Sequence, residues 1–192
     1  MKSRFCWRAT TACSSEEPAA IEPGRTISGD AGKTLIVYFS WGGNTRTVAN
    51  HIHDLIGGDI VEVEMVVPYP DTYEEVTQIA PGELESDYCP ELKTKVENMD
   101  EYDTLIVGTP IWGGHLTPVM KSFLASYDLS GKAIAPFCTH GGSGTAQSVN
   151  DIRSVCSNST ILSSLVVYGS RAESFRADVE RWLEQIGIIK NN

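Results

Sequence analysis

The sequence SWGGNT at residues 40–45 follows the apolar run TLIVYF at residues 34–39 and leads into a stretch with apolar residues at helical spacing. A buried strand that turns through glycines directly into a helix is typical of the first unit of a doubly wound α/β fold. Glycines let backbone N–H groups point into such a turn, and the start of the helix adds positive potential. The turn therefore predicts a phosphate site. It lacks the lysine of a nucleoside triphosphate loop and the G-x-G-x-x-G pattern of a dinucleotide fingerprint, which disfavours both of those ligands.

The rest of the chain repeats this alternation of strand and helix. The predicted strands are residues 34–39, 60–65, 104–109, 133–138 and 160–168. The second and fifth mix polar with apolar positions, which indicates edge strands, and the other three are near-continuous apolar runs typical of strands covered on both faces. Helices are predicted over residues 48–56, 116–124, 150–156 and 175–186, with Thr117 capping the second and a capping pattern from Ser170 to Glu173 opening the last. Right-handed crossovers then predict an α/β doubly wound five-stranded parallel sheet in the order 2-1-3-4-5, a three-layer sandwich with a ligand crevice beside the first strand.

Two more unusual loops follow the third and fourth strands. An exposed Trp112 beside Gly113 and Gly114 can stack on a flat ring while the backbone comes close to it. The glycine-rich run HGGSG at residues 140–144 can also approach a ligand through its backbone. Together the three loops describe a pocket with a phosphate end and a planar aromatic end, which is the shape of FMN. The candidate cofactor-binding residues are Ser40, Trp41, Gly42, Gly43, Asn44, Thr45, Pro110, Ile111, Trp112, Gly113, Gly114, His115, Thr139, His140, Gly141, Gly142 and Ser143.

Other functional interpretations of these loops agree less well with the sequence. A hydrolase nucleophile at Ser143 would need a glycine where Thr145 stands. His115, His140 and Cys138 lack a further ligand at a recognisable metal-binding spacing, so no metal site is predicted. A receiver-type signalling domain shares the strand order but needs acidic residues where the first strand ends. No catalytic side chain is predicted.

The SWGGNT turn resembles the phosphate loop of flavodoxins, whose pattern S/T-x-S/T-G-x-T it matches at Ser40, Gly43 and Thr45. Gly42 departs from that pattern by removing a hydroxyl, which leaves the phosphate one donor fewer. TPIWGGH and FCTHGGSGT, residues 109–115 and 137–145, resemble the two loops that flank the isoalloxazine in a bacterial flavodoxin-like branch. The resemblance covers about residues 33–188.

The resemblance implies an FMN-binding electron carrier for protein partners. The phosphate would be held by N–H groups and hydroxyls without a cation, and the ring would lie beside aromatic and backbone groups with one edge exposed. In flavodoxins a backbone carbonyl after the third strand turns to accept a hydrogen from N5 of the reduced flavin, which implies that Gly113 or Gly114 absorbs the rotation. The alternatives are an FMN-dependent NAD(P)H:quinone-type oxidoreductase that acts on a small acceptor, and a scaffold that no longer binds flavin.

Acidic residues outnumber basic ones in the chain, whose formal net charge is −10. Residues 66–103 hold eleven acids and two bases, a local charge of −9. This charge disfavours nucleic acid as a partner, because nucleic acid requires a basic surface. It predicts an acidic face that attracts basic redox proteins, with simple solubility as the alternative.

The composition of residues 1–33 predicts a flexible leader, and the flavodoxin-like domain is predicted over residues 34–190. The segment TTACSS at residues 10–15 resembles the end of a bacterial lipoprotein signal, in which Cys13 would carry the lipid, although the apolar segment that should precede it is missing. Contact with a membrane is therefore predicted only through such an anchor, and the protein is otherwise expected in the cytoplasm. The five cysteines include no CxxC pair, and their odd number predicts no disulfide framework.

Overall fold

A computed structural model describes residues 32–189, and the predicted leader and Cys13 lie outside the described residues. One sheet has the path β2-β1-β3-β5-β6, with β7 also paired to β5 and the short β4 paired to β3. Its strands are β1 (Thr34–Tyr38), β2 (Asp59–Glu62), β3 (Thr104–Trp112), β4 (His115–Leu116), β5 (Ala133–His140), β6 (Thr160–Ile161) and β7 (Leu165–Tyr168). All pairings except that of β3 with β4 are parallel. The predicted order 2-1-3-4-5 is confirmed, with the fifth strand divided into β6 and β7.

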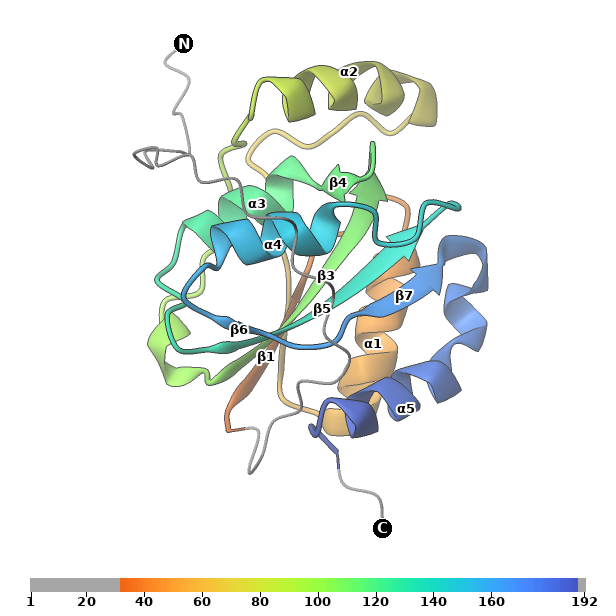
Figure 1. Ribbon diagram of the computed structural model, residues 1–192. Coiled ribbons are helices and arrows are strands. Elements are labelled where there is room, and N and C mark those ends of the chain that lie inside the picture. Colours follow the sequence, from red (N-terminus) through yellow and green to blue (C-terminus); the bar gives the residue numbers. More distant parts are fainter. Residues whose placement is uncertain (1–31, 190–192) are drawn as a thin grey trace, which may run out of the picture.

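Helices cover both faces of this sheet (Figure 1). They are α1 (Asn44–Ile56), α2 (Tyr73–Glu85), α3 (Pro118–Ala125), α4 (Ser148–Val155) and α5 (Arg176–Gln185), with short 3₁₀ helices η1 (Met99–Glu101) and η2 (Gly169–Ser174). Alternate residues of each central strand point to opposite faces. Leu35 and Leu105 belong to the same apolar core as Phe123 of α3, while Ile36 and Ile106 belong to the core that contains Trp182 of α5. The three layers thus hold two apolar cores, and the central strands are buried on both sides.

Helix α2 is the largest element that the sequence pattern did not predict. It lies above the carboxyl ends of the strands, away from the two layers of covering helices (Figure 1). Only Val76 and Ala80 of its thirteen residues are buried, and Pro81 lies inside it. Thr72 caps its start by accepting a hydrogen bond from the Glu75 backbone N–H. With so few buried positions, no continuous apolar stripe marks α2, and the sequence pattern predicts an acidic face here but no helix.

The two predicted helix caps have different outcomes. The capping pattern at Ser170 is wrong as a start for α5, because residues 169–174 form η2 and α5 begins at Arg176. Thr117 does occupy the N-cap of α3, but its side chain makes no capping hydrogen bond. Its hydroxyl lies 3.2 Å from that of Thr109 instead, which ties the start of α3 to β3.

Between residues 32 and 189, no helix is both long enough and apolar enough to cross a bilayer.

Candidate functional site

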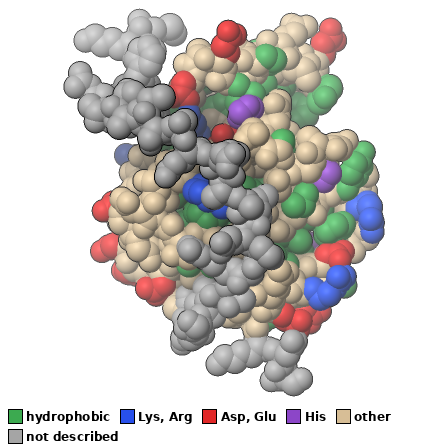
Figure 2. Space-filling view, viewed as in Figure 1, with side chains coloured by type: hydrophobic (Ala, Val, Ile, Leu, Met, Phe, Trp, Pro, Cys, Tyr) green, Lys and Arg blue, Asp and Glu red, His purple; other side chains and the backbone are tan. Residues whose placement is uncertain are grey.

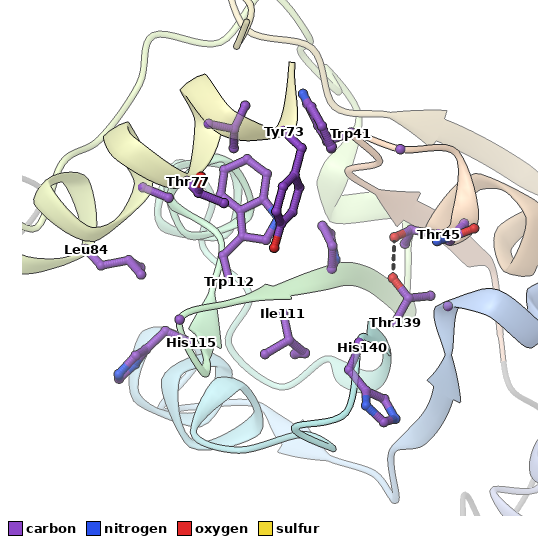
Figure 3. Close-up of a pocket in the computed structure, with 18 of the residues that line it drawn as sticks. Trp41, Thr45, Tyr73, Thr77, Leu84, Ile111, Trp112, His115, Thr139 and His140 are labelled. Atoms are coloured by element: carbon purple, nitrogen blue, oxygen red, sulfur yellow. Dashed lines mark hydrogen bonds between the residues drawn. The ribbon is translucent and has the colours of Figure 1, made fainter. Parts of the chain in front are cut away.

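A cavity of about 780 Å³ opens at the carboxyl ends of β1, β3, β5 and β7, beneath α2 (Figure 3). This volume lies within the range of about 300–1,000 Å³ that is usual for small-molecule sites. Its lining residues are Trp41, Gly42, Asn44, Thr45, Tyr73, Val76, Thr77, Ala80, Pro81, Leu84, Pro110, Ile111, Trp112, Gly113, His115, Thr139, His140, Gly141, Tyr168, Gly169 and Ser170. The three predicted loops therefore meet at one cavity.

One end of the cavity is formed by the turn between β1 and α1. Gly43 is the N-cap of α1 with a φ of 89°, a left-handed conformation that glycine adopts without strain. The Ser40 hydroxyl accepts a hydrogen bond from the Arg46 N–H at 3.2 Å, which closes the turn. The hydroxyls of Thr45 and Thr139 lie 2.8 Å apart and are buried. Because the pair has two hydrogens and uses one between them, one hydrogen remains for a ligand.

The cation nearest in sequence to this turn is already paired. The Arg46 guanidinium binds both carboxylate oxygens of Glu62 on β2, at 2.9 and 2.6 Å. The Tyr38 hydroxyl donates to the same carboxylate at 3.2 Å, and burial next to Glu62 raises the pKa of Tyr38 to about 12. Among the described residues, no lysine or arginine lines the cavity. Donors at this end are therefore neutral hydroxyls, amides and backbone N–H groups.

The opposite end is formed by the hairpin of β3 and β4, which extends β3 beyond its predicted end. Gly113 and Gly114 form its two-residue turn with φ values of 56° and 88°. Two successive positive φ angles define a type I′ turn, the form that suits a tight hairpin. The Gly114 carbonyl accepts a hydrogen bond from Gln147 N–H at 2.8 Å, so the turn is tied to the loop after β5. His115 and the Leu116 N–H both bond the Asp151 carboxylate at 3.0 Å, which anchors the hairpin to α4.

Trp112 provides an aromatic wall that is supported from behind. Its ring packs edge-on against Tyr69, with centroids 4.8 Å apart, and against Phe39 at 5.9 Å. The Tyr69 hydroxyl donates to the Glu83 carboxylate of α2 at 2.6 Å. Burial raises the pKa of both Tyr69 and Glu83. This contact holds the C-terminal half of α2 beside Trp112.

The loop after β5 is organised by His140. Its Nδ1 accepts hydrogen bonds from the N–H groups of Gly142 and Gly144 at 2.9 and 3.1 Å, so the ring hydrogen lies on Nε2. The ring also packs edge-on against Tyr168, with centroids 5.4 Å apart. The imidazole thus shapes the loop that closes this side of the cavity.

Most of the predicted binding residues line the cavity. Those that do not are Ser40, Gly43, Gly114, Gly142 and Ser143. Ser40, Gly43 and Gly114 shape the adjoining turns through the bonds and φ angles given above.

Sequence reasoning missed two walls of the cavity. The α2 wall contributes Tyr73, Val76, Thr77, Ala80, Pro81 and Leu84, and the loop after β7 contributes Tyr168, Gly169 and Ser170. Figure 3 shows Tyr73 and Thr77 extending from α2 on one side of the cavity, with Thr45 and Thr139 on another. The four-residue spacing of Tyr73 and Thr77, with Ala80 and Leu84 following, places them on one face of a helix, which was the only signal for this wall. The loop after β7 offered no signal beyond its position at a strand end.

Comparisons with known proteins agree with this architecture. The family model described as Flavodoxin matches residues 33–186. A solved structure from Bacteroides eggerthii is 25% identical with a TM-score of 0.72, and the match covers 82% of this chain and 99% of that one. A flavoprotein from Lactobacillus acidophilus, solved in complex with FMN, is 23% identical with a TM-score of 0.65, over 79% of this chain and 99% of that one. No curated protein matches in a sequence comparison.

The family model spans the sheet, its covering helices and every loop that lines the cavity, which is well over half of the chain. The chain belongs to the flavodoxin family.

Proposed function

We propose that this chain is an FMN-binding electron-transfer protein that exchanges electrons with protein partners. The observation that carries the proposal is the cavity itself, which joins a cation-free phosphate turn to an aromatic wall at the switch point of the sheet. Membership of the flavodoxin family supports FMN as the cofactor. When bound, FMN supplies one- and two-electron redox chemistry, and the protein supplies binding, orientation and electrostatics.

The residues present fit that cofactor. At the phosphate end, the spare hydrogen of the Thr45 and Thr139 pair, the Asn44 side-chain amide and the backbone of Gly42 line the cavity as donors. At the other end, the Trp112 indole offers an apolar face, and the glycine turn brings the backbone close. The Glu62 carboxylate keeps the Arg46 guanidinium engaged, so the site adds no positive charge that would favour an anionic reduced cofactor.

Partner docking is proposed on the part of the acidic segment that borders the cavity. The acids of residues 66–103 do not form one face: Asp100 and Glu101 lie in η1, before β3 begins, and Glu101 pairs with Lys33 at 2.8 Å. That is the amino end of the parallel strands, opposite the cavity. Figure 2 accordingly shows acidic side chains both at the top, around α2, and along the lower rim.

Residues 66–88 combine acidic and exposed apolar side chains. They contain six acids and no lysine or arginine. Among the described residues, six large apolar side chains are exposed, and five are in this segment: Val66, Val67, Tyr73, Ile79 and Tyr88. An apolar centre with a charged rim is the usual composition of a protein interface. The docking surface, defined as residues 66–88, would suit a partner with an apolar patch inside a basic rim.

A paired charge-neutralisation experiment tests this function. Glu74→Gln with Glu85→Gln removes two exposed charges from the docking surface, and Glu97→Gln with Asp100→Asn removes two from elsewhere in the acidic segment. The bimolecular rate of electron transfer from the reduced FMN-loaded protein to a basic c-type cytochrome is measured by stopped flow across ionic strengths. We expect the first pair to slow the low-salt rate several-fold and to flatten its salt dependence, while the second pair has a much smaller effect.

A salt-independent rate in the unmodified protein, or equal slowing by both pairs, would contradict docking at residues 66–88. Steady NADPH oxidation by the purified protein, without a separate reductase, would instead favour the oxidoreductase alternative.

A further inference from the structure

We propose that Ser170, in the loop after β7, binds the cofactor phosphate from the side opposite the SWGGNT turn. The inference rests on the proposed binding of FMN. Under this proposal, the phosphate lies between donors from the first and the last strand-end loops of the domain.

The packing of the loop after β7 places Ser170 at the phosphate end of the cavity. A Cβ added to Gly169 would lie 2.8 Å from the Asn44 side-chain Nδ2 and 3.6 Å from the His140 carbonyl oxygen. The backbone at residue 169 is therefore in close contact with the first residue of α1. Asn44, Gly169 and Ser170 all line the cavity. Ser170 thus stands across from the turn that the sequence assigns to phosphate.

The Ser170 hydroxyl is also available. It is exposed, and within residues 32–189 it forms no hydrogen bond. Ser174, in the same 3₁₀ helix, differs in two ways. Its hydroxyl donates to the Arg171 carbonyl at 2.9 Å, and the residue does not line the cavity. A serine hydroxyl that faces a ligand cavity with its hydrogen unused can donate to a phosphate oxygen.

The charge balance of the site explains why an additional neutral donor would contribute to phosphate binding. Within the part of the chain that the structure describes, no lysine or arginine lines the cavity, and Arg46 is held by Glu62. Gly42 stands where the flavodoxin pattern has a hydroxyl, so the turn is one donor short. A phosphate that is bound without a cation depends on the number of neutral donors around it. Ser170 supplies one from outside the turn.

Binding of FMN and riboflavin to the cofactor-free protein tests the proposal, because the two ligands differ only in the phosphate. Dissociation constants are measured by fluorescence titration for the unmodified protein, Ser170→Ala, Ser170→Thr and the matched control Ser174→Ala. We expect Ser170→Ala to weaken FMN about tenfold, as for loss of a hydrogen bond to a charged group, and to leave riboflavin unchanged. Ser170→Thr, which keeps the hydroxyl, and Ser174→Ala should both bind FMN within about twofold of the unmodified protein.

A Ser170→Ala variant that binds FMN normally would overturn the proposal. Equal weakening of FMN and riboflavin would also overturn it, because the effect would not lie at the phosphate. These outcomes are distinguishable from failure of the proposed function, in which the unmodified protein itself would show no preference for FMN over riboflavin.

Discussion

Replacing Trp112 with alanine is expected to weaken binding of oxidised FMN by about ten- to a hundredfold, and to weaken riboflavin equally. The indole lines the cavity and is held in place by Tyr69 and Phe39, so its loss removes both a preformed aromatic surface and the apolar area that a ring would cover. Riboflavin carries the same ring as FMN, so both ligands should lose the same contact. Fluorescence titration of the cofactor-free variant gives both constants.

Trp112→Phe is the matched control for this experiment. It keeps an aromatic face against Tyr69 and should lose much less affinity than the alanine variant. Circular dichroism and urea unfolding establish that the variants remain folded, because an indole packed against two aromatic rings also contributes to stability. A folded Trp112→Ala variant that binds FMN like the unmodified protein would show that the ring does not lie against this wall.

Alanine at Gly113 and alanine at Gly114 are both expected to lower stability, with the larger loss at Gly113, and to have different effects on the one-electron midpoint potential. Both glycines already have positive φ, so an alanine at either position should cost about 1 kcal/mol or more of unfolding free energy. At Gly113 the added Cβ would also lie 2.9 Å from Leu84 Cδ1 of α2, which adds a steric cost. Gly113→Asn keeps that Cβ but tolerates positive φ, and should therefore be more stable than Gly113→Ala.

The difference in potential follows from the geometry of the turn. The Gly114 carbonyl is engaged by Gln147, so a peptide rotation of the kind known in flavodoxins falls to the Gly113 carbonyl. Rotation of that central peptide converts a type I′ turn into type II′, which retains positive φ at Gly113 and abolishes it at Gly114. If positive φ arose only after the rotation, alanine at the glycine that absorbs the rotation would lower the potential. The observed φ values reverse this for Gly114.

In the FMN-loaded protein, Gly114→Ala should raise the one-electron midpoint potential by some tens of millivolts, because rotation relieves its strain. Gly113→Ala should leave the potential nearly unchanged, because its strain is present in both turn types. Redox titration of the two variants measures the shifts. A lowered potential in Gly114→Ala would contradict the assignment of the rotating peptide.

The strand order and the meeting of the three loops could be predicted because each depends on local patterns. Continuous apolar runs such as residues 104–107 mark strands buried on both faces, and the carboxyl ends of parallel strands share one edge. The loops after β1, β3 and β5 therefore had to converge. Their identification needed only the glycine and aromatic residues at those ends.

The position of α2 could not be predicted, because its role depends on tertiary contacts. Its inner face meets the cavity rather than the core, so Tyr73 and Thr77 remain exposed and no continuous apolar stripe marks the helix. The helix is held in place by the hydrogen bond from the Tyr69 hydroxyl to Glu83 and by Leu84, which lies next to Gly113 of the hairpin turn. The same reason applies to Ser170, which a local capping pattern assigned to α5 while the packing of η2 places it at the cavity.

Titration of the cofactor-free protein with FMN, riboflavin and FAD, followed by flavin absorption and fluorescence, tests the central claim most directly. The structure offers donors for one terminal phosphate at the SWGGNT turn and an aromatic wall for one ring, so FMN should bind with one-to-one stoichiometry and far more tightly than either of the other two flavins. Equal affinity for FMN and riboflavin would contradict the phosphate site, and absence of FMN binding would contradict the account as a whole.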